Sequence, residues 1–170
     1  PAPPARVGVL GGGRMGAGIA HAFLLAGSRV TVIERDAPAA DAAAQRIGDS
    51  LARSVERGST DRPLNDLEAA LTVGDDIAAF ADADLVIEAV PEDRALKGDA
   101  LGRIARVVAP ASAIASNTSS ISIDALAATI THPERFLGLH FFNPVPASAL
   151  VEIVTGAATA PAVVESARAW

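Results

Sequence analysis

The sequence lacks cysteine and tyrosine and contains a single lysine, Lys97, among its 170 residues. Without cysteine the chain has no thiol nucleophile, no disulfide and no thiolate ligand, which excludes thiol catalysis, CxxC redox chemistry and zinc ribbons. Aromatic residues make up only 4% of the chain, so aromatic stacking cannot dominate the core. We expect no metal site, and the one lysine in a chain that otherwise uses arginine marks position 97 for attention.

Long apolar runs and basic clusters are also missing. No run of 18 residues lacks a charged side chain, so we expect neither a membrane-spanning helix nor a signal peptide. The formal net charge is −6 and the basic residues form no run, which argues against nucleic acid or an anionic membrane as the main partner. Hydrophobic residues make up 50% of the chain, enough to bury a core without disulfides or metal. These properties predict a soluble, intracellular globular domain.

Short apolar runs alternate with helical patterns along the whole chain. Strands are expected at residues 7–10, 29–34, 71–73, 85–90, 113–116, 136–142 and 150–154. Helices are expected at residues 15–26, 37–57, 76–80, near 101–108, and at 123–128 and 161–170. This alternation predicts an α/β fold whose sheet is doubly wound, mostly parallel and covered by helices on both faces.

The last two expected strands have a short connection. The segment Asn143–Pro146 is too short for a crossover helix, so these strands are expected to be antiparallel neighbours. The final helix reaches Trp170 without a stop signal. We therefore expect residues 1–170 to form one domain of a longer protein.

A glycine-rich turn follows the first expected strand and opens the first expected helix. Its spacing fits G-x-G-x-x-G, which taken alone is also typical of a helix-capping turn. Here Glu34 ends the next strand 18 residues after the last glycine, which is the arrangement of a dinucleotide site. Glycines let a pyrophosphate approach the backbone N–H groups and the positive end of the helix. The residues assigned to this cofactor-binding turn are Gly11, Gly13, Arg14, Met15 and Gly16.

The carboxylate of Glu34 indicates which dinucleotide is bound. It is placed to accept hydrogen bonds from the adenosine ribose and would repel a 2′-phosphate, which favours NAD over NADP. The neighbouring Arg35 opposes this preference. A flavin dinucleotide uses the same glycine pattern, but a chain of this length offers little room for a flavin site.

Three segments together resemble one known family. Val7–Asp36, the string SNTSS at 116–120 and the string GLHFFNPVP at 138–146 are similar to the NAD-binding N-terminal domain of the L-3-hydroxyacyl-CoA dehydrogenase family. The resemblance covers nearly the whole chain and implies a Rossmann-like fold and NAD as the cofactor. It also implies an oxidoreductase of the 3-hydroxybutyryl-CoA dehydrogenase type, which interconverts an L-3-hydroxyacyl-CoA and its 3-oxoacyl-CoA.

Three further functions stay open. The acyl group could be tethered to a carrier protein instead of CoA, or the substrate could be a hydroxy acid without CoA. The intact HFFNPVP string favours an acyl thioester, because similar enzymes for free hydroxy acids commonly depart from it. A non-catalytic NAD-binding module is disfavoured by the presence of both His140 and Glu152.

The resemblance implies that His140 is the catalytic acid/base and that Glu152 is its carboxylate partner. The residue pattern agrees, because two antiparallel neighbouring strands can bring these side chains together. The pKa of a histidine side chain is ordinarily about 6.5, so it can take the proton of a secondary alcohol as hydride leaves. A neighbouring carboxylate fixes which ring nitrogen carries the proton. Outside such a family string, a structural core histidine is the commoner role. His21 and His132 have no comparable context and receive no role.

The resemblance also implies roles around the cofactor. Ser119 is expected to hydrogen-bond the substrate oxygen beside the nicotinamide, unless it serves as a helix N-cap. Asn143 is expected to contact the cofactor, and it can at the same time be a turn residue before Pro144. Glu92 and Lys97 are expected to lie around the cofactor ribose, unless they belong to a solvated helix surface.

Further implications concern the thioester and a second domain. Ser50 and Arg57, on the expected second helix, match positions that contact the CoA moiety, with arginine in place of a lysine, although an exposed charged face would also explain them. The family places a helical C-terminal domain next, which completes the substrate site and forms a homodimer. Because that domain is not part of residues 1–170, we expect these residues alone to bind NAD(H) but to turn over substrate slowly or not at all. The resemblance also implies a cytoplasmic enzyme.

Overall fold

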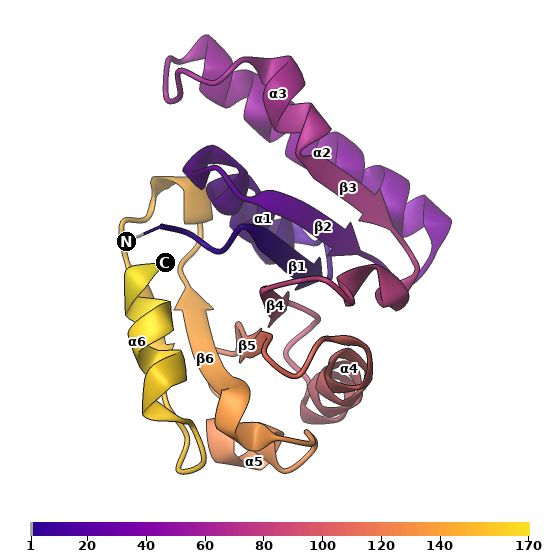
Figure 1. The fold of residues 1–170 in the computed structure, drawn as a ribbon. Helices are drawn as coiled ribbons and strands as arrows, with labels where there is room; N and C mark the ends of the chain where they lie inside the picture. Colours follow the sequence, from indigo (N-terminus) through magenta and orange to yellow (C-terminus); the bar gives the residue numbers. More distant parts are fainter. Residues whose placement is uncertain (1) are drawn as a thin grey trace.

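The computed structural model describes residues 2–170, which form a seven-stranded sheet in the order β3-β2-β1-β4-β5-β6-β7 (Figure 1). All pairings are parallel except that of β6 with β7. The predicted doubly wound, mostly parallel sheet with an antiparallel last strand is confirmed. The strands are β1 (Arg6–Leu10), β2 (Arg29–Ile33), β3 (Leu71–Gly74), β4 (Leu85–Glu88), β5 (Ala113–Ser116), β6 (Phe136–Phe141) and β7 (Val151–Val154).

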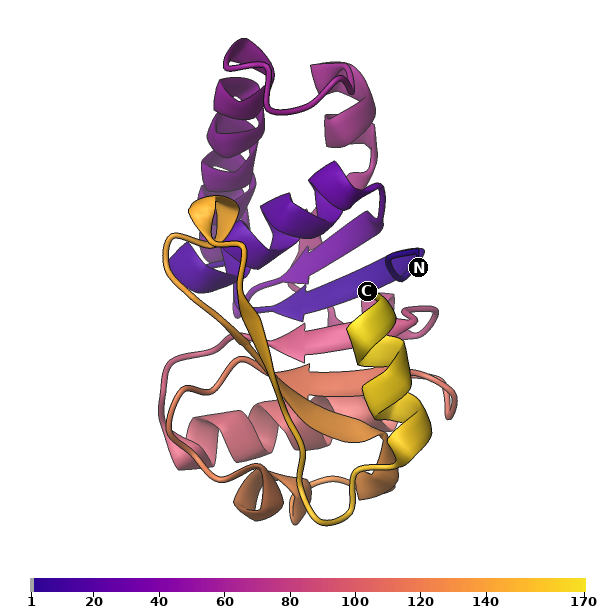
Figure 2. The same ribbon diagram turned by 90° about the vertical axis from the view of Figure 1, so that its left-hand side faces the viewer.

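Helices cover both faces of the sheet, as the two views of the ribbon show (Figure 2). One face carries α1 (Arg14–Ala26), α2 (Ala37–Glu56), α3 (Leu64–Ala69) and α6 (Pro161–Ala169). The other carries α4 (Arg94–Val107), α5 (Ile123–Ala127) and the 3-10 helix η1 (Ile77–Phe80). Two further 3-10 helices are η2 (Pro133–Arg135) and η3 (Val145–Ala147). Among residues 2–170, no helix is long and apolar enough to cross a membrane.

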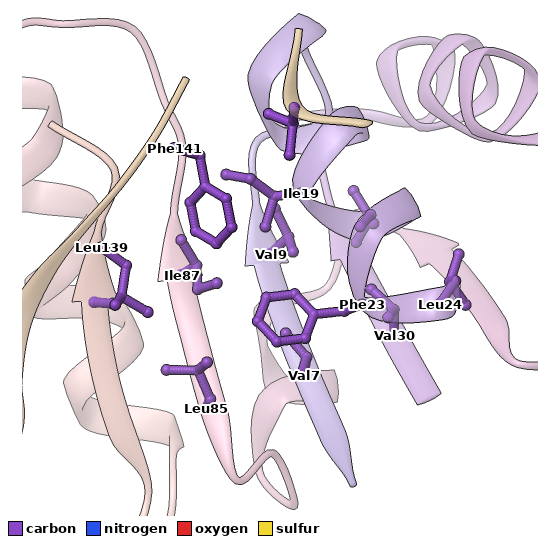
Figure 3. Close-up of a cluster of buried hydrophobic side chains, with 14 of the residues drawn as sticks. Val7, Val9, Ile19, Phe23, Leu24, Val30, Leu85, Ile87, Leu139 and Phe141 are labelled. Atoms are coloured by element: carbon purple, nitrogen blue, oxygen red, sulfur yellow. The ribbon is translucent and has the colours of Figure 1, made fainter. Parts of the chain in front are cut away.

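The period of two along each strand divides the core between these faces. In β4, Leu85 and Ile87 pack under α1, whereas Val86 packs under α4. Across the α1 face, Phe23 of α1 meets Phe141 of β6 edge to face, with ring centroids 6.3 Å apart (Figure 3). This packing fixes α1 against the strands whose ends carry the candidate site.

Local signals explain where the main helices begin and end. The side chain of Asp36 accepts a hydrogen bond from the Ala39 N–H at 2.8 Å and caps α2. Asp93 caps α4 in the same way, through the Leu96 N–H at 2.9 Å. α1 ends at Gly27, whose φ of 104° lies in the left-handed region that glycine tolerates. Short polar side chains and a glycine thus set these helix ends.

The structure differs from the predicted elements in several ways. α4 begins at Arg94, seven residues before the predicted helix near 101–108, and the 3-10 helices η2 and η3 were not predicted. The short helix α3 was not predicted, because six residues with only Leu67 buried give no helical period to detect. The predicted helix at 76–80 is the 3-10 helix η1, and it buries Phe80 completely. Strand β4 ends at Glu88, two residues earlier than predicted, and the chain then turns toward α4.

Arg135 is a buried arginine at the end of the sheet opposite the carboxyl ends of the strands. Its Nη1 donates to the Ala109 carbonyl oxygen at 2.7 Å, and its Nη2 donates to the Ala105 carbonyl oxygen at 3.1 Å. Ala105 lies in the last turn of α4, where backbone carbonyls lack helical partners and the helix dipole is negative, and Ala109 lies two residues after the helix. Arg135 therefore ties α4 to the start of β6.

We predict that Arg135→Met lowers the free energy of unfolding by about 1–3 kcal/mol, because methionine fills the space but leaves buried carbonyls without donors. Urea denaturation followed by circular dichroism measures this change. Arg168→Met is the control, since Arg168 pairs with Glu165 on the surface of α6 and such pairs contribute little. Equal midpoints for the wild type and Arg135→Met would contradict the prediction.

Candidate functional site

A cleft of about 870 Å³ runs along the carboxyl ends of the parallel strands. It passes over β1 and β4, where the strand order reverses, which is the usual ligand site of such sheets. Its lining includes most of the residues that the sequence singled out. These are Gly11, Gly13, Arg14, Met15, Glu34, Arg35, Glu92, Lys97, Ser119, His140 and Asn143.

The glycine turn brings α1 against β1 more closely than a side chain would permit. A Cβ built at Gly16 would overlap the carbonyl oxygen of Gly11, and Gly11 itself has a φ of 98°. At Gly13, in contrast, a Cβ would meet no described atom within 4 Å, because this residue faces the cleft. The first N–H groups of α1 therefore open toward the cleft, where an anion can bind.

Glu34 follows β2 and closes the other side of this turn. Its Oε1 accepts a hydrogen bond from the Gly12 N–H at 2.7 Å. Arg46 of α2 donates to the Gly12 carbonyl oxygen at 2.6 Å, so the turn is held from both sides. Arg35 is directed to Asp36, with Nε 3.1 Å from the carboxylate, and its side chain is 81% exposed. Glu34 therefore presents the carboxylate at this end of the cleft.

His140 and Glu152 face each other across the antiparallel pair. They are direct register partners in β6 and β7, and Nδ1 of His140 lies 2.9 Å from Oε2 of Glu152. Because a carboxylate only accepts hydrogen bonds, Nδ1 carries the proton and Nε2 is left for the cleft. The Phe142 ring packs against the imidazole, with centroids 4.4 Å apart. The predicted proximity of the two side chains is confirmed.

The carboxylate of Glu92 organises the SNTSS loop. Its Oε1 accepts hydrogen bonds from the hydroxyl of Thr118 at 2.6 Å and from the N–H groups of Ser119 and Ser120 at 3.0 and 3.1 Å. Burial opposes ionisation, but the hydrogen bond from Thr118, the charge of Lys97 and further hydrogen bonds outweigh it and lower the pKa of Glu92 to about 2. The carboxylate is therefore ionised at neutral pH.

Lys97 is buried, which excludes the alternative that it belongs to a solvated helix surface. Its side chain is 2% exposed, and its ammonium contacts Glu88 Oε1 at 2.8 Å, Glu92 Oε2 at 3.3 Å and the Val90 carbonyl oxygen at 3.0 Å. The contacts with Glu88 and Val90 are hydrogen bonds, and the contact with Glu92 is an ion pair. Lys97 therefore borders the cleft as part of a buried network.

The loop at 117–120, called the serine loop below, and the helix α2 differ in whether they line the cleft. Ser119 is not a helix N-cap, because α5 is capped by Ser122, whose hydroxyl accepts from the Ala125 N–H at 3.3 Å. Ser119 instead lines the cleft. Ser50 and Arg57 lie on and just after α2, and among the described residues the lining of the cleft does not include them.

Two residues that support the site were not predicted from the sequence. Asn117 accepts a hydrogen bond from the Phe141 N–H at 2.9 Å and ties the serine loop to β6 beside His140. Glu88 is a fully buried carboxylate at the end of β4. The signal that could have revealed Glu88 is an acidic residue that directly follows the apolar run Leu85–Ile87.

The family described as "3-hydroxyacyl-CoA dehydrogenase, NAD binding domain" matches residues 6–170. The chain belongs to this family. A 3-hydroxybutyryl-CoA dehydrogenase of Mycobacterium tuberculosis is 47% identical over 88% of this chain and 53% of its own length. A 3-hydroxyadipyl-CoA dehydrogenase of Escherichia coli K12 is 44% identical over 94% of this chain and 34% of its own length.

Solved structures of relatives have the same fold. The (S)-3-hydroxybutyryl-CoA dehydrogenase PaaH1 from Ralstonia eutropha superposes with a TM-score of 0.92 at 36% identity, over 98% of this chain and 59% of that one. The M. tuberculosis protein FadB2 gives a TM-score of 0.91 at 44% identity, over 99% and 59%. The chain thus spans about half the length of many of these relatives.

Two glycine variants separate folding from cofactor binding. Gly16→Ala is expected to lower stability by about 1–3 kcal/mol or more, because its Cβ overlaps a backbone oxygen. Gly13→Ala is expected to keep the wild-type melting temperature but to weaken NADH binding about tenfold or more, because its Cβ projects toward the cleft. Thermal melting and NADH fluorescence titration measure the two effects. Undiminished NADH binding by Gly13→Ala would place the pyrophosphate elsewhere.

Proposed function

We propose that this chain is the cofactor-binding and proton-transferring part of an NAD-dependent 3-hydroxyacyl-CoA dehydrogenase of the 3-hydroxybutyryl-CoA type. The observation that carries the proposal is that one cleft is lined both by the glycine turn with Glu34 and by His140, whose Nδ1 is hydrogen-bonded to Glu152. A module that only binds a nucleotide does not need the second feature. The names of the relatives support the same substrate class.

The cleft fits a nicotinamide dinucleotide along its length. The N–H groups at the start of α1 would bind the pyrophosphate beside Gly11 and Gly13, and Glu34 would accept hydrogen bonds from the adenosine ribose. Asn143, at the other end of the cleft, would hold the nicotinamide half. When bound, NAD supplies the acceptor or donor of hydride. The nicotinamide half would then lie at the end of the cleft where His140 lies.

His140 would transfer the proton. In the oxidising direction, Nε2 takes the hydroxyl proton of the 3-hydroxyacyl group as the C3–O bond becomes a carbonyl. Glu152 stabilises the imidazolium and holds the ring. In the reducing direction the imidazolium returns the proton to the forming alkoxide. Acid/base help of this kind contributes roughly 10²- to 10⁴-fold.

Ser119 would donate a hydrogen bond to the substrate oxygen. Its backbone N–H donates to Glu92 at 3.0 Å, which fixes the loop, and its hydroxyl, which donates to the same oxygen at 3.4 Å, would turn from Glu92 to the substrate oxygen. This loop borders the same end of the cleft as His140, and the two side chains would contact the same oxygen. Glu92 and Lys97, which both line the cleft, would lie around the cofactor ribose, with the Lys97 ammonium held by Glu88, Glu92 and the Val90 carbonyl oxygen.

We further propose that the thioester extends over α2. Ser50 and Arg57 would contact the CoA moiety, and a carrier-protein thioester would use the same face. A second, helical domain would exclude water from the acyl chain, add further substrate contacts and form a homodimer. The proposed enzyme acts in the cytoplasm, where acyl-CoA substrates and NAD are both present.

The test of the proton transfer is His140→Gln in the protein at its full natural length. We expect kcat for acetoacetyl-CoA reduction by NADH to fall by about 10²- to 10⁴-fold, because glutamine cannot transfer the proton. NADH affinity should stay unchanged. Loss of absorbance by the reduced cofactor follows the reaction. Wild-type protein that binds NADH but leaves acetoacetyl-CoA unreacted would contradict the short-chain CoA substrate.

Cofactor choice is tested at Glu34. The wild type is expected to prefer NADH to NADPH, and Glu34→Gln is expected to reduce this preference about tenfold or more by removing the repulsive charge while Arg35 remains. The ratio of kcat/KM values for the two cofactors measures the change. Asp36→Asn is the control for an altered charge close to Arg35. A wild type that prefers NADPH would assign the decisive role to Arg35.

A further inference from the structure

A buried polar network lies behind the cleft, between β4, α4 and the loop at 117–120. Glu88 is at its centre with 0% of its surface exposed, and among the described residues the lining of the cleft does not include it. Its Oε1 accepts from the Lys97 ammonium at 2.8 Å and from the Val90 N–H at 2.7 Å. Its Oε2 accepts from the Ser116 hydroxyl at 2.6 Å. Both carboxylate oxygens are thus fixed by donors from three different segments.

One route leads from Glu88 to the serine loop through two ion pairs. The Lys97 ammonium bridges Glu88 and Glu92, at 2.8 and 3.3 Å. Glu92 uses its other oxygen to accept from the N–H groups of Ser119 and Ser120. A fully buried carboxylate in the sheet is therefore connected to the loop that borders the cleft.

A second route passes through the end of β5. The Ser116 hydroxyl, while donating to Glu88, accepts from the Thr118 N–H at 3.2 Å. The Thr118 hydroxyl in turn donates to Glu92. The two routes meet at Glu92, so the loop is restrained from both of its sides by contacts that begin at Glu88.

The charges give Glu88 a role that a neutral residue would not fill. Burial raises the pKa of its carboxyl, although the charge of Lys97 and hydrogen bonds from Lys97, Ser116 and Val90 favour the ionised form. If the carboxylate were absent, the Lys97 ammonium would keep only one of its two anionic partners and would be attracted toward Glu92 at the cleft. Glu92 and the loop would then lose their fixed position.

We propose that Glu88 is a positioning residue for the cofactor and for Ser119, acting through Lys97, Ser116 and Glu92. It touches neither cofactor nor substrate, and it sets where the serine loop stands at the edge of the cleft. The effect on turnover rests on the proposed function, whereas the effect on NADH binding does not.

The experiment compares Glu88→Gln and Glu88→Asp with the wild type in the full-length protein. Glutamine keeps the size and removes the charge, and aspartate keeps the charge but shortens the reach. Arg135→Met is the matched control, because Arg135 is also buried, charged and hydrogen-bonded but lies at the opposite end of the sheet. The measurements are melting temperature, the NADH dissociation constant from fluorescence, and kcat and KM for acetoacetyl-CoA.

For Glu88→Gln we expect the NADH dissociation constant to rise and kcat to fall, each about tenfold or more, because a small displacement of positioning groups is costly. KM for the thioester should change less than kcat. Arg135→Met should lower the melting temperature. Its NADH dissociation constant, its KM and its kcat per folded molecule should stay close to the wild-type values. A purely structural role for Glu88 would give the pattern of this control.

Two outcomes overturn the inference. One is wild-type NADH binding and kcat in folded Glu88→Gln. If Glu88→Gln does not fold, Glu88→Asp is the variant that decides. The second overturning result is then an NADH dissociation constant of Glu88→Asp that equals that of the wild type. A wild type that binds NADH but reduces no thioester would refute the proposed function alone, since the comparison of NADH constants would still test Glu88.

Discussion

The parallel direction of neighbouring strands is the constraint on which the candidate site depends. Parallel strands end at the same edge of a sheet, so the glycine turn after β1, Glu34 after β2 and the serine loop after β5 meet there although they are distant in sequence. β7 is the necessary exception. Because it runs antiparallel to β6, its second residue, Glu152, stands directly opposite His140 near the end of β6.

The same edge binds an anion in a chain that is acidic overall. The net charge is −6, and the ammonium of Lys97 is matched by two carboxylates. We propose that the N–H groups at the start of α1, together with Arg14 in the lining of the cleft, supply the attraction, and the N–H groups act only at short range. Glu34 would add a repulsion next to them. In this proposal the cleft selects a dinucleotide by the fit of the backbone and excludes the additional phosphate of NADP by charge.

Contacts between neighbouring elements were predictable from the sequence, and contacts through the interior were not. Apolar periodicity and the short Asn143–Pro146 connection predicted the sheet and the approach of His140 to Glu152. The burial of Lys97 against Glu88 was not readable, because a polar helix start such as 94–99 has the pattern of a solvated surface. That burial depends on where β4 ends. Among several neighbouring serines, likewise, the sequence offers no basis for choosing Ser122 as the cap.

The charges of the Glu88–Lys97 pair need a reason other than stability. Desolvation offsets most of the attraction in a buried ion pair, and an apolar pair of similar volume would pack between β4 and α4 at least as well. An apolar pair, however, would give Glu92 no fixed direction. With the ammonium between a fully buried carboxylate and one that is 37% exposed at the cleft, the rigidity of the sheet is transmitted to the serine loop. The ion pair is therefore better explained by the orientation of the site than by the free energy of folding.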